Sequence, residues 1–183
     1  VQHDNLAVVS MSPETASNIN GVIGLLDDPK TQRLILQAIG KPTCCIEQLV
    51  FRWGTQIASA TQLPDVGEWI DPADQRVPSW LKPFNYGPVL IAWDDNGSYG
   101  AGVGIKRHGL IGCELAVVTR QQLRGRGLAK HLVAQAARRI REEGNLPMYL
   151  HHSNNSASAR VAEAVGLSHQ NWYVFTLAET RED

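Results

Sequence analysis

The second half of the chain begins with short apolar segments separated by polar turns. Residues 89–93 and 99–106 are mostly apolar, and residues 94–98 between them carry the Asn-Gly pair typical of a hairpin turn. Residues 114–119 form a third segment, rich in β-branched side chains. This pattern predicts three consecutive antiparallel strands.

The rest of that half predicts helices in alternation with strands. Leu128 opens a run in which apolar residues recur at helical spacing, with charged residues on the opposite face. Gly144 ends this helix, because glycine is the residue most typical of a helix C-terminus. Further elements are predicted as a strand over residues 147–153, a helix over residues 157–165 and a last strand over residues 171–178.

The first third of the chain favours helices. After a short strand at residues 6–10, the segment Ser12-Pro13-Glu14 is typical of a helix start, since serine caps, proline fits the first position and an acid complements the dipole. We expect helices from there towards Leu26, over residues 30–39 and over residues 43–61.

Residues 62–88 are expected to form an irregular loop. The segment is rich in proline and holds Trp69 and Trp80. Two tryptophans are not typical of a flexible linker, so the loop is either pinned to the surface by its aromatic side chains or forms a wall of a binding pocket. Both alternatives are open.

Composition and charge limit the class of protein. The chain has 17 Lys and Arg against 18 Asp and Glu, so no basic excess indicates a nucleic-acid partner. Three cysteines do not form a disulfide framework and fit a reducing compartment. No apolar run reaches the roughly 20 residues of a membrane helix, and the first residues lack the pattern of a secretory signal. We therefore expect a cytoplasmic protein without nucleic-acid or membrane partners.

A loop with two glycines opens the helix that begins at Leu128. In Arg124-Gly125-Arg126-Gly127 the glycines let the backbone approach a ligand, and the unpaired N–H groups of the first helical turn favour an anion. A P-loop would have Lys-Ser or Lys-Thr after Gly127, and a Rossmann fingerprint would have Gly or Ala in place of Lys130. The loop therefore indicates a pyrophosphate site of another kind.

Two segments resemble motifs of the GNAT superfamily of acyl-CoA-dependent N-acetyltransferases. Gln122-x-x-Gly125-x-Gly127 is similar to its acyl-CoA-binding motif. Residues 155–167 are similar to its other familiar segment, in which an Asn precedes a helix of small residues that ends in Gly-Leu. The two segments occur in the family's order, and the resemblance covers about residues 89–178.

The resemblance implies the fold class. It implies an α/β GNAT fold, with a central mixed, mostly antiparallel sheet flanked by helices, in which two parallel central strands, at Glu114 and at Tyr149, splay apart at their C-terminal ends. A single GNAT domain is expected over residues 1–183. It would comprise a motif-bearing core over about 89–178, a helical part over 1–61 and the irregular loop over 62–88.

The resemblance also implies acetyl-CoA as the acyl donor. The pantetheine arm would pair with the backbone near Val117 and Val118 as an extra strand would, and the pyrophosphate would bind the N–H groups of the glycine loop. The residues expected to bind acetyl-CoA are Val117, Val118, Gln122, Arg124, Gly125, Arg126, Gly127, Leu128, Ala129, Asn155 and Arg160.

The implied reaction needs a base to remove a proton from the acceptor, because an alkyl ammonium has a pKa of about 10. Glu114 is the candidate, since it lies on the strand that family members use for this role, and it would act through water. The alternative is a surface or ion-paired glutamate. His151 and His152 are reserve bases. They would face opposite ways in a strand, which does not favour a shared metal site, and no metal is expected.

The departing thiolate gains from a proton donor. Many relatives carry a tyrosine seven residues after the motif asparagine, and Ala162 at that position excludes such an acid here. Asn155-x-x-Ser158 instead resembles the ribosomal-protein alanine acetyltransferase branch, in which a serine near this place assists the thiolate. Ser158 is therefore the candidate, and a small residue in a tight helix contact is the equal alternative.

The expected function is transfer of an acetyl or short acyl group from acyl-CoA to a primary amine, by direct attack in a ternary complex. The alternatives are a CoA-binding module without chemistry, or an acyl-CoA hydrolase or decarboxylase on the same fold. The acceptor is expected to be a small-molecule or peptide amine, and Trp69 and Trp80 are candidate contacts for it. Whether the protein forms a homodimer is left open. Acidic side chains on the loop either attract a cationic amine or are only solvated; they are Asp65, Glu68, Asp71 and Asp74.

Overall fold

The computed structural model describes residues 1–4, 6–8, 18–19 and 26–179. The chain divides into two compact units. The larger unit comprises Arg52–His151 and Asn155–Gln170, and the smaller unit comprises Val1–Phe51, His152–Asn154 and Asn171–Asp183. The single domain expected over residues 1–183 stays a prediction.

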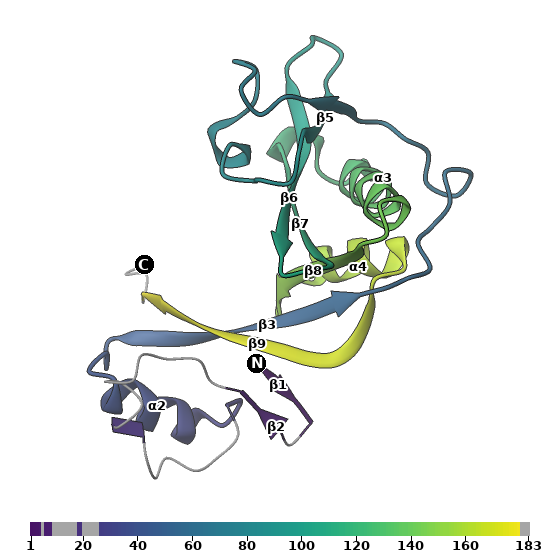
Figure 1. Cartoon of the computed structure of the whole chain (residues 1–183). Helices are drawn as coiled ribbons and strands as arrows, with labels where there is room; N and C mark the ends of the chain where they lie inside the picture. The colour runs from purple at the N-terminus through teal and green to yellow at the C-terminus, as the bar shows by residue number, and fades with distance from the viewer. Residues whose placement is uncertain (5, 9–17, 20–25, 180–183) are drawn as a thin grey trace. The chain divides into compact units, whose positions relative to one another are not determined.

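In the larger unit, five strands lie side by side in the order β8-β7-β6-β5-β4 (Figure 1). All neighbouring pairs are antiparallel except β7 and β8, which run parallel, so the expected mixed and mostly antiparallel sheet is confirmed. The expected meander is confirmed as β5, β6 and β7. The strands span Glu68–Ile70 (β4), Val89–Trp93 (β5), Tyr99–His108 (β6), Gly112–Thr119 (β7) and Leu146–His152 (β8).

The parallel pairing of β7 and β8 ends before the strands do. It runs from Gly112 opposite Leu146 to Leu115 opposite Tyr149. Beyond that point β7 continues to Thr119 and stays paired with β6. The last residues of β7 therefore have a partner strand on one side, and the expected splay begins after Leu115.

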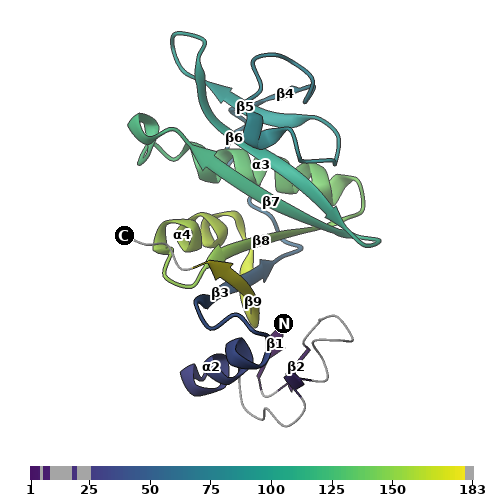
Figure 2. The ribbon, with the colours of Figure 1, turned by 90° about the vertical axis from the view of Figure 1, so that its left-hand side faces the viewer.

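Helices α3 (Leu128–Glu142) and α4 (Ser156–Val165) lie on the same side of these strands (Figure 1). Figure 2 shows α3 passing behind β6 and β7. The apolar face that the sequence predicts for α3 is the face that is buried. Its side chains form the main core together with Leu90, Val103 and Leu115 of the strands. The fully buried residues of α3 include Leu132, Val133, Ala136, Ala137 and Ile140.

The opposite face of the sheet carries a second, smaller core. Val89 and Ile91 of β5 point to this face, where they pack with Leu81 of the short 3-10 helix η1 (Ser79–Leu81). A Cβ atom on Gly104 of β6 would lie 2.3 Å from Cγ of Phe84, so glycine is needed where this ring rests on the strand. The segment 62–88 is thus not wholly irregular, because it contains β4, η1 and the packed aromatic residues.

In its described residues, the smaller unit has the strands β2-β1-β9-β3 in that order, together with the helix α2. The expected helix over residues 30–39 is confirmed as α2 (Pro29–Ala38), which Asp28 caps at the N-terminus. The expected helix from Ser12 towards Leu26 falls largely outside the described residues. The strands are β1 (Gln2–His3), β2 (Leu6–Ala7), β3 (Cys44–Trp53) and β9 (Ser168–Glu179), and the last two also contribute residues to the larger unit.

The expected helix over residues 43–61 is wrong, because Cys44–Trp53 is the strand β3. Its apolar side chains fit a helical period, but the segment is also rich in β-branched and aromatic residues, which favour a strand. Its place beside β9 in the sheet decides between these two patterns. In the described part of the chain, no helix is both long enough and apolar enough to span a membrane.

Candidate functional site

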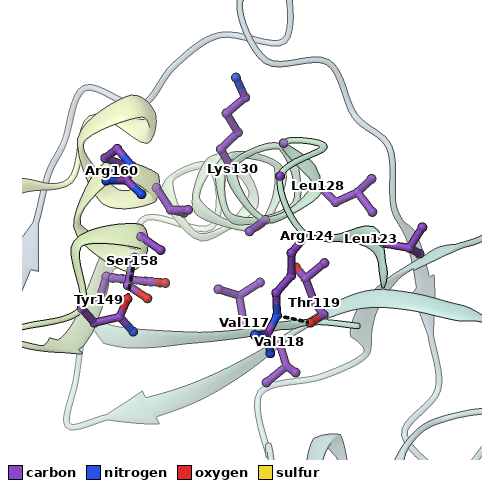
Figure 3. Close-up of a pocket in the computed structure, with 16 residues that line it drawn as sticks. Val117, Val118, Thr119, Leu123, Arg124, Leu128, Lys130, Tyr149, Ser158 and Arg160 are labelled. Carbon is purple, nitrogen blue, oxygen red and sulfur yellow. Dashed lines mark hydrogen bonds between the residues drawn. The ribbon is translucent and has the colours of Figure 1, made fainter. Parts of the chain in front are cut away.

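A cavity of about 580 Å³ opens in the larger unit where β7 and β8 separate (Figure 3). Its walls are the end of β7, the glycine loop with the start of α3, Tyr149 of β8, and the first turns of α4. The cavity therefore lies where the sequence motifs predicted the acyl-CoA site. Its lining residues are Val117, Val118, Thr119, Leu123, Arg124, Gly125, Gly127, Leu128, Ala129, Lys130, Tyr149, Asn155, Ala157, Ser158, Arg160 and Val161.

The strand wall of this cavity offers backbone groups that no neighbouring strand pairs. Arg120 N–H donates to the carbonyl of Gly100 at 2.9 Å, which sets the alternation of backbone directions along β7. Because successive residues of an antiparallel pair alternate in direction, the N–H and C=O groups of Val117 and Thr119 point away from β6, towards the splay. Val118 turns its backbone towards β6, and the residue is also part of the cavity wall.

The loop wall presents the N-terminus of α3 without a side-chain cap. Gly125 and Gly127 have φ of +80° and +79°, a conformation that glycine adopts without strain. Since the first intrahelical donors to Gly127 O are the N–H groups of Lys130 and His131, those of Leu128 and Ala129 precede the intrahelical ladder. This geometry suits an anion such as a pyrophosphate.

Basic side chains from the glycine loop, α3 and α4 line the same cavity. Arg124, Lys130 and Arg160 line it, and Nε of Arg124 donates to the carbonyl of Thr119 at 3.3 Å (Figure 3). Oγ1 of Thr119 is buried and has no hydrogen-bond partner among the described residues. Uncapped N–H groups, three cations and a buried unsatisfied hydroxyl are a donor set that fits the pyrophosphate and amide groups of CoA.

Two of the expected CoA-binding residues are not in the cavity wall. Gln122 lies in the 3-10 helix η2 (Gln121–Leu123), and both Gln122 and Arg126 are exposed. Conversely, several residues that line the cavity were not predicted from the sequence. Lys130 could have been found, because it lies one helical turn after Gly127. The other missed residues are Thr119, Leu123, Ala157 and Val161.

Glu114 forms a hydrogen-bonded pair with His108. Its Oε2 lies 2.7 Å from Nε2 of His108, and the two side chains are 30% and 43% exposed. Glu114 alternates with the buried Leu115 along β7, so it faces the side of the sheet opposite α3. The carboxylate is therefore accessible but paired, and it lies outside the cavity lining.

His151 is buried and accepts a hydrogen bond from Nε of Arg52 at 2.9 Å. Arg52 also forms an ion pair with Glu163 at 3.3 Å. Because a guanidinium donates to Nε2, this ring nitrogen is engaged as an acceptor and does not suit a base. His152 is exposed in the smaller unit, with Nδ1 3.8 Å from a carboxylate oxygen of Glu47. No group of three potential metal ligands occurs in the described ranges.

The start of α4 places Ser158 in the cavity wall. Oδ1 of Asn155 accepts the N–H of Ser158 at 3.0 Å, so Asn155 caps the helix as well as lining the cavity. Ser158 lies next to Tyr149, whose side chain is almost completely buried (Figure 3). Burial raises the pKa of Tyr149, and its hydrogen bond with Ser158 acts in the opposite direction. Ala162, where many relatives carry tyrosine, is fully buried in the core.

The two loop tryptophans pack elsewhere in the larger unit. Trp69 lies on β4, with the guanidinium of Arg139 4.3 Å from its ring centre. Trp80 packs edge-on against Phe84, on the sheet face opposite α3. Neither ring lines the cavity, and the packing of Trp69 favours a structural role. Trp80 shares its sheet face with Glu114.

The acidic side chains of the loop have local partners. Asp65 pairs with Arg138, and Glu68 accepts a hydrogen bond from Nε1 of Trp93 at 3.0 Å. Asp71 accepts the N–H of Ala73 at 2.8 Å, and Asp74 pairs with Arg76 at 2.8 Å. These contacts favour turn and surface roles over attraction of a cationic acceptor.

Solved structures of similar fold include proteins described as acetyltransferases of the GNAT family. One from Colwellia psychrerythraea has a TM-score of 0.56 at 16% identity, covering 85% of this chain and 63% of its own. A GCN5-related N-acetyltransferase-like protein from Streptococcus suis has a TM-score of 0.60 at 16% identity, covering 82% of this chain and 68% of its own. This chain thus spans about two thirds of the length of these structures.

Sequence comparison locates the likeness in the part of the chain that forms the cavity. No curated protein matches the chain. The profile of the family described as FR47-like protein matches residues 103–175, which include β7, the glycine loop, α3, β8 and α4. Residues 103–175 are therefore similar to the FR47-like family, and the chain has the fold of the GNAT acetyltransferases.

Proposed function

We propose that this protein is an N-acyltransferase that moves an acetyl group from acetyl-CoA to a primary amine, by direct attack in a ternary complex. One observation carries the proposal: a single cavity joins an uncapped helix N-terminus, for a pyrophosphate, to an unpaired strand edge, for a pantetheine arm. Acetyl-CoA supplies the activated acyl group, and the chain's residues bind and orient it.

Backbone groups of two residues would hold the thioester and the pantetheine arm of the donor. The N–H of Val117 points into the splay and would donate to the thioester oxygen, which gains negative charge as the amine attacks. The N–H and C=O groups of Thr119 would pair with the pantetheine amides, provided that the side chain of Arg124 swings from the Thr119 carbonyl to the phosphates. Arg160 and Lys130 would balance the phosphate charge.

The sheet face opposite α3 would receive the amine. Glu114, held by His108, would take the proton of the ammonium through water. Trp80 and Phe84 lie on that face and could contact an apolar part of the acceptor. The acceptor remains proposed as a small-molecule or peptide amine.

Release of the CoA thiol, measured with and without amines, tests the proposed reaction. Acetyl-CoA with small amines and peptides should give amine-dependent thiol release and an acetylated product by mass. Release without an amine would indicate a hydrolase, and no release would indicate a binding module.

Substitution of Gly127 tests the proposed CoA site by calorimetry. Gly127→Asp should weaken CoA binding at least tenfold, or about 1.4 kcal/mol, because it places a carboxylate at the anion site. Gly127→Asn is the neutral matched variant, which shares the backbone strain and should lose less. Gly97→Asp changes another glycine of positive φ, in the β5–β6 turn, and should leave CoA affinity unchanged. Equal affinity of Gly127→Asp and wild type would contradict the site.

A further inference from the structure

Arg124 lies in the part of the cavity where the pantetheine arm is proposed to bind. Its Nε donates to the carbonyl of Thr119 at 3.3 Å, and Figure 3 shows its side chain reaching from the glycine loop to the end of β7. That carbonyl points away from β6, and no neighbouring strand pairs with it, because the pairing of β7 with β8 ends at Leu115. The guanidinium of Arg124 therefore occupies the edge position that a pantetheine amide would take.

The contact between Arg124 and Thr119 joins a cation to a neutral acceptor. In the described part of the chain, the cavity wall contains three basic residues and no acidic one. A phosphate bears the opposite charge and can accept two parallel hydrogen bonds from a guanidinium, whereas the Thr119 carbonyl accepts one from Nε. A phosphate at the N-terminus of α3, which the same loop forms, would therefore draw Arg124 away from Thr119.

Thr119 has a second polar group that indicates a ligand at this point. Its Oγ1 is buried and has no hydrogen-bond partner among the described residues. A buried hydroxyl without a partner is unfavourable, and most such groups in native proteins are satisfied. A ligand on this part of β7 would therefore gain two polar groups of Thr119, and in this conformation Arg124 holds one of them.

On the basis of the proposed acyl transfer, we propose that Arg124 is a specificity-determining residue that admits donors carrying phosphate groups and disfavours pantetheine thioesters without them. A donor with phosphates binds Arg124 at the glycine loop, and this movement releases the Thr119 carbonyl for the pantetheine arm. A donor without phosphates has to displace Arg124 by itself. Its apparent affinity is therefore reduced by the fraction of molecules in which the carbonyl is released.

Removal of the Arg124 side chain should have opposite effects on the two kinds of donor. Acetyl-CoA should bind Arg124→Ala roughly tenfold more weakly than wild type, because a phosphate loses a charged partner. S-acetylpantetheine, which lacks the phosphates, should bind this variant roughly fivefold more tightly, the scale of one hydrogen bond that no longer has to be broken. Calorimetry measures the first affinity, and a ligand-detected NMR titration measures the second, weaker one.

The wild-type protein provides a test that needs no substitution. Inorganic pyrophosphate at the N-terminus of α3 should draw Arg124 to itself and so raise the affinity for S-acetylpantetheine roughly fivefold, because both ligands favour the same conformation. In Arg124→Ala this coupling between the two ligands should disappear.

Lys130→Ala is the matched control. It removes the same charge from the same cavity, but Figure 3 shows the Lys130 side chain pointing away from β7. This variant should weaken the binding of acetyl-CoA and leave the affinity for S-acetylpantetheine at the wild-type value. The melting temperature of Arg124→Ala should equal that of wild type, since the Arg124 side chain is exposed.

Two results would overturn the inference. One is an affinity of Arg124→Ala for S-acetylpantetheine that is equal to or below that of wild type. The other is an affinity of wild type for S-acetylpantetheine that pyrophosphate lowers or leaves unchanged. Failure of the wild-type protein to bind acetyl-CoA would instead contradict the proposed function, so the two failures are distinguishable.

Discussion

At the residue scale, the proposed chemistry depends on side chains whose partners are neighbours in the sheet. Glu114 and His108 come from the two strands of one hairpin, β7 and β6, and meet at 2.7 Å. The pair holds the carboxylate in one orientation, which an isolated surface glutamate would lack. A carboxylate in this setting could accept the ammonium proton through water.

Glu114→Gln should lower kcat by roughly a hundredfold at neutral pH, the usual scale for one acid–base group. The loss should shrink as pH rises, because the free amine becomes abundant and needs no base. Steady-state rates over about pH 6 to 9 measure this, with KM for acetyl-CoA as a check on binding. Glu142→Gln, on the exposed end of α3, is the control. Wild-type activity of Glu114→Gln at every pH would move the base elsewhere.

At the element scale, the cavity exists because three element ends meet. β7 continues beyond its last residue paired with β8. Helix α3 begins without a side-chain cap, whereas α4 begins with one. The contrast between the helices has a physical reason. Asn155 satisfies a backbone N–H of α4 internally, whereas the open N-terminus of α3 keeps its donors for a ligand.

Asn155→Ala should destabilise the fold by about 1 kcal/mol, since it removes the cap of α4. Asn155→Asp should keep the stability, because aspartate caps as well as asparagine does. Urea unfolding of both variants measures the difference. Asn154→Ala changes the preceding exposed asparagine and should have little effect. Equal stability of the Ala variant and wild type would mean that the Asn155 contact does not support the helix.

At the scale of the whole molecule, stability should depend on pH through a cluster of basic groups. Burial lowers the pKa of His169, and the charges of Arg52 and His151 lower it further. The folded state therefore prefers neutral His169, and the unfolded chain binds the proton more readily. This stability is fully present above the unfolded pKa of about 6.5 and is lost as pH falls through the lower folded value.

His169→Gln should flatten the decline in melting temperature between about pH 7 and pH 5. Three aspartates contribute to the pH dependence of stability outside this window. Hydrogen bonds from Arg76 hold the pKa of Asp74 at about 2, and the pKa values of Asp28 and Asp94 are also lowered, so their contribution is lost only in stronger acid. His3→Gln, in the smaller unit, is the matched control. A decline as steep in His169→Gln as in wild type would place the pH dependence elsewhere.

The sequence by itself determined the local parts of this protein. The apolar face of α3, the hairpin turn before β6 and the glycine loop before α3 depend on neighbouring residues, so patterns along the chain predicted them. The same local character explains why the glycine loop and the segment at Asn155 could be matched to motifs of one family.

Only the tertiary structure decided which residues meet. β3 became a strand because it lies beside β9, although its own apolar spacing also fits a helix. Tyr149 and Ser158 come from different elements, and the pairing of Glu114 with His108 depends on strand register. The ring of Trp69 packs against the guanidinium of Arg139 and lies outside the cavity lining. Such contacts depend on packing between distant segments, whose geometry no single stretch of sequence contains.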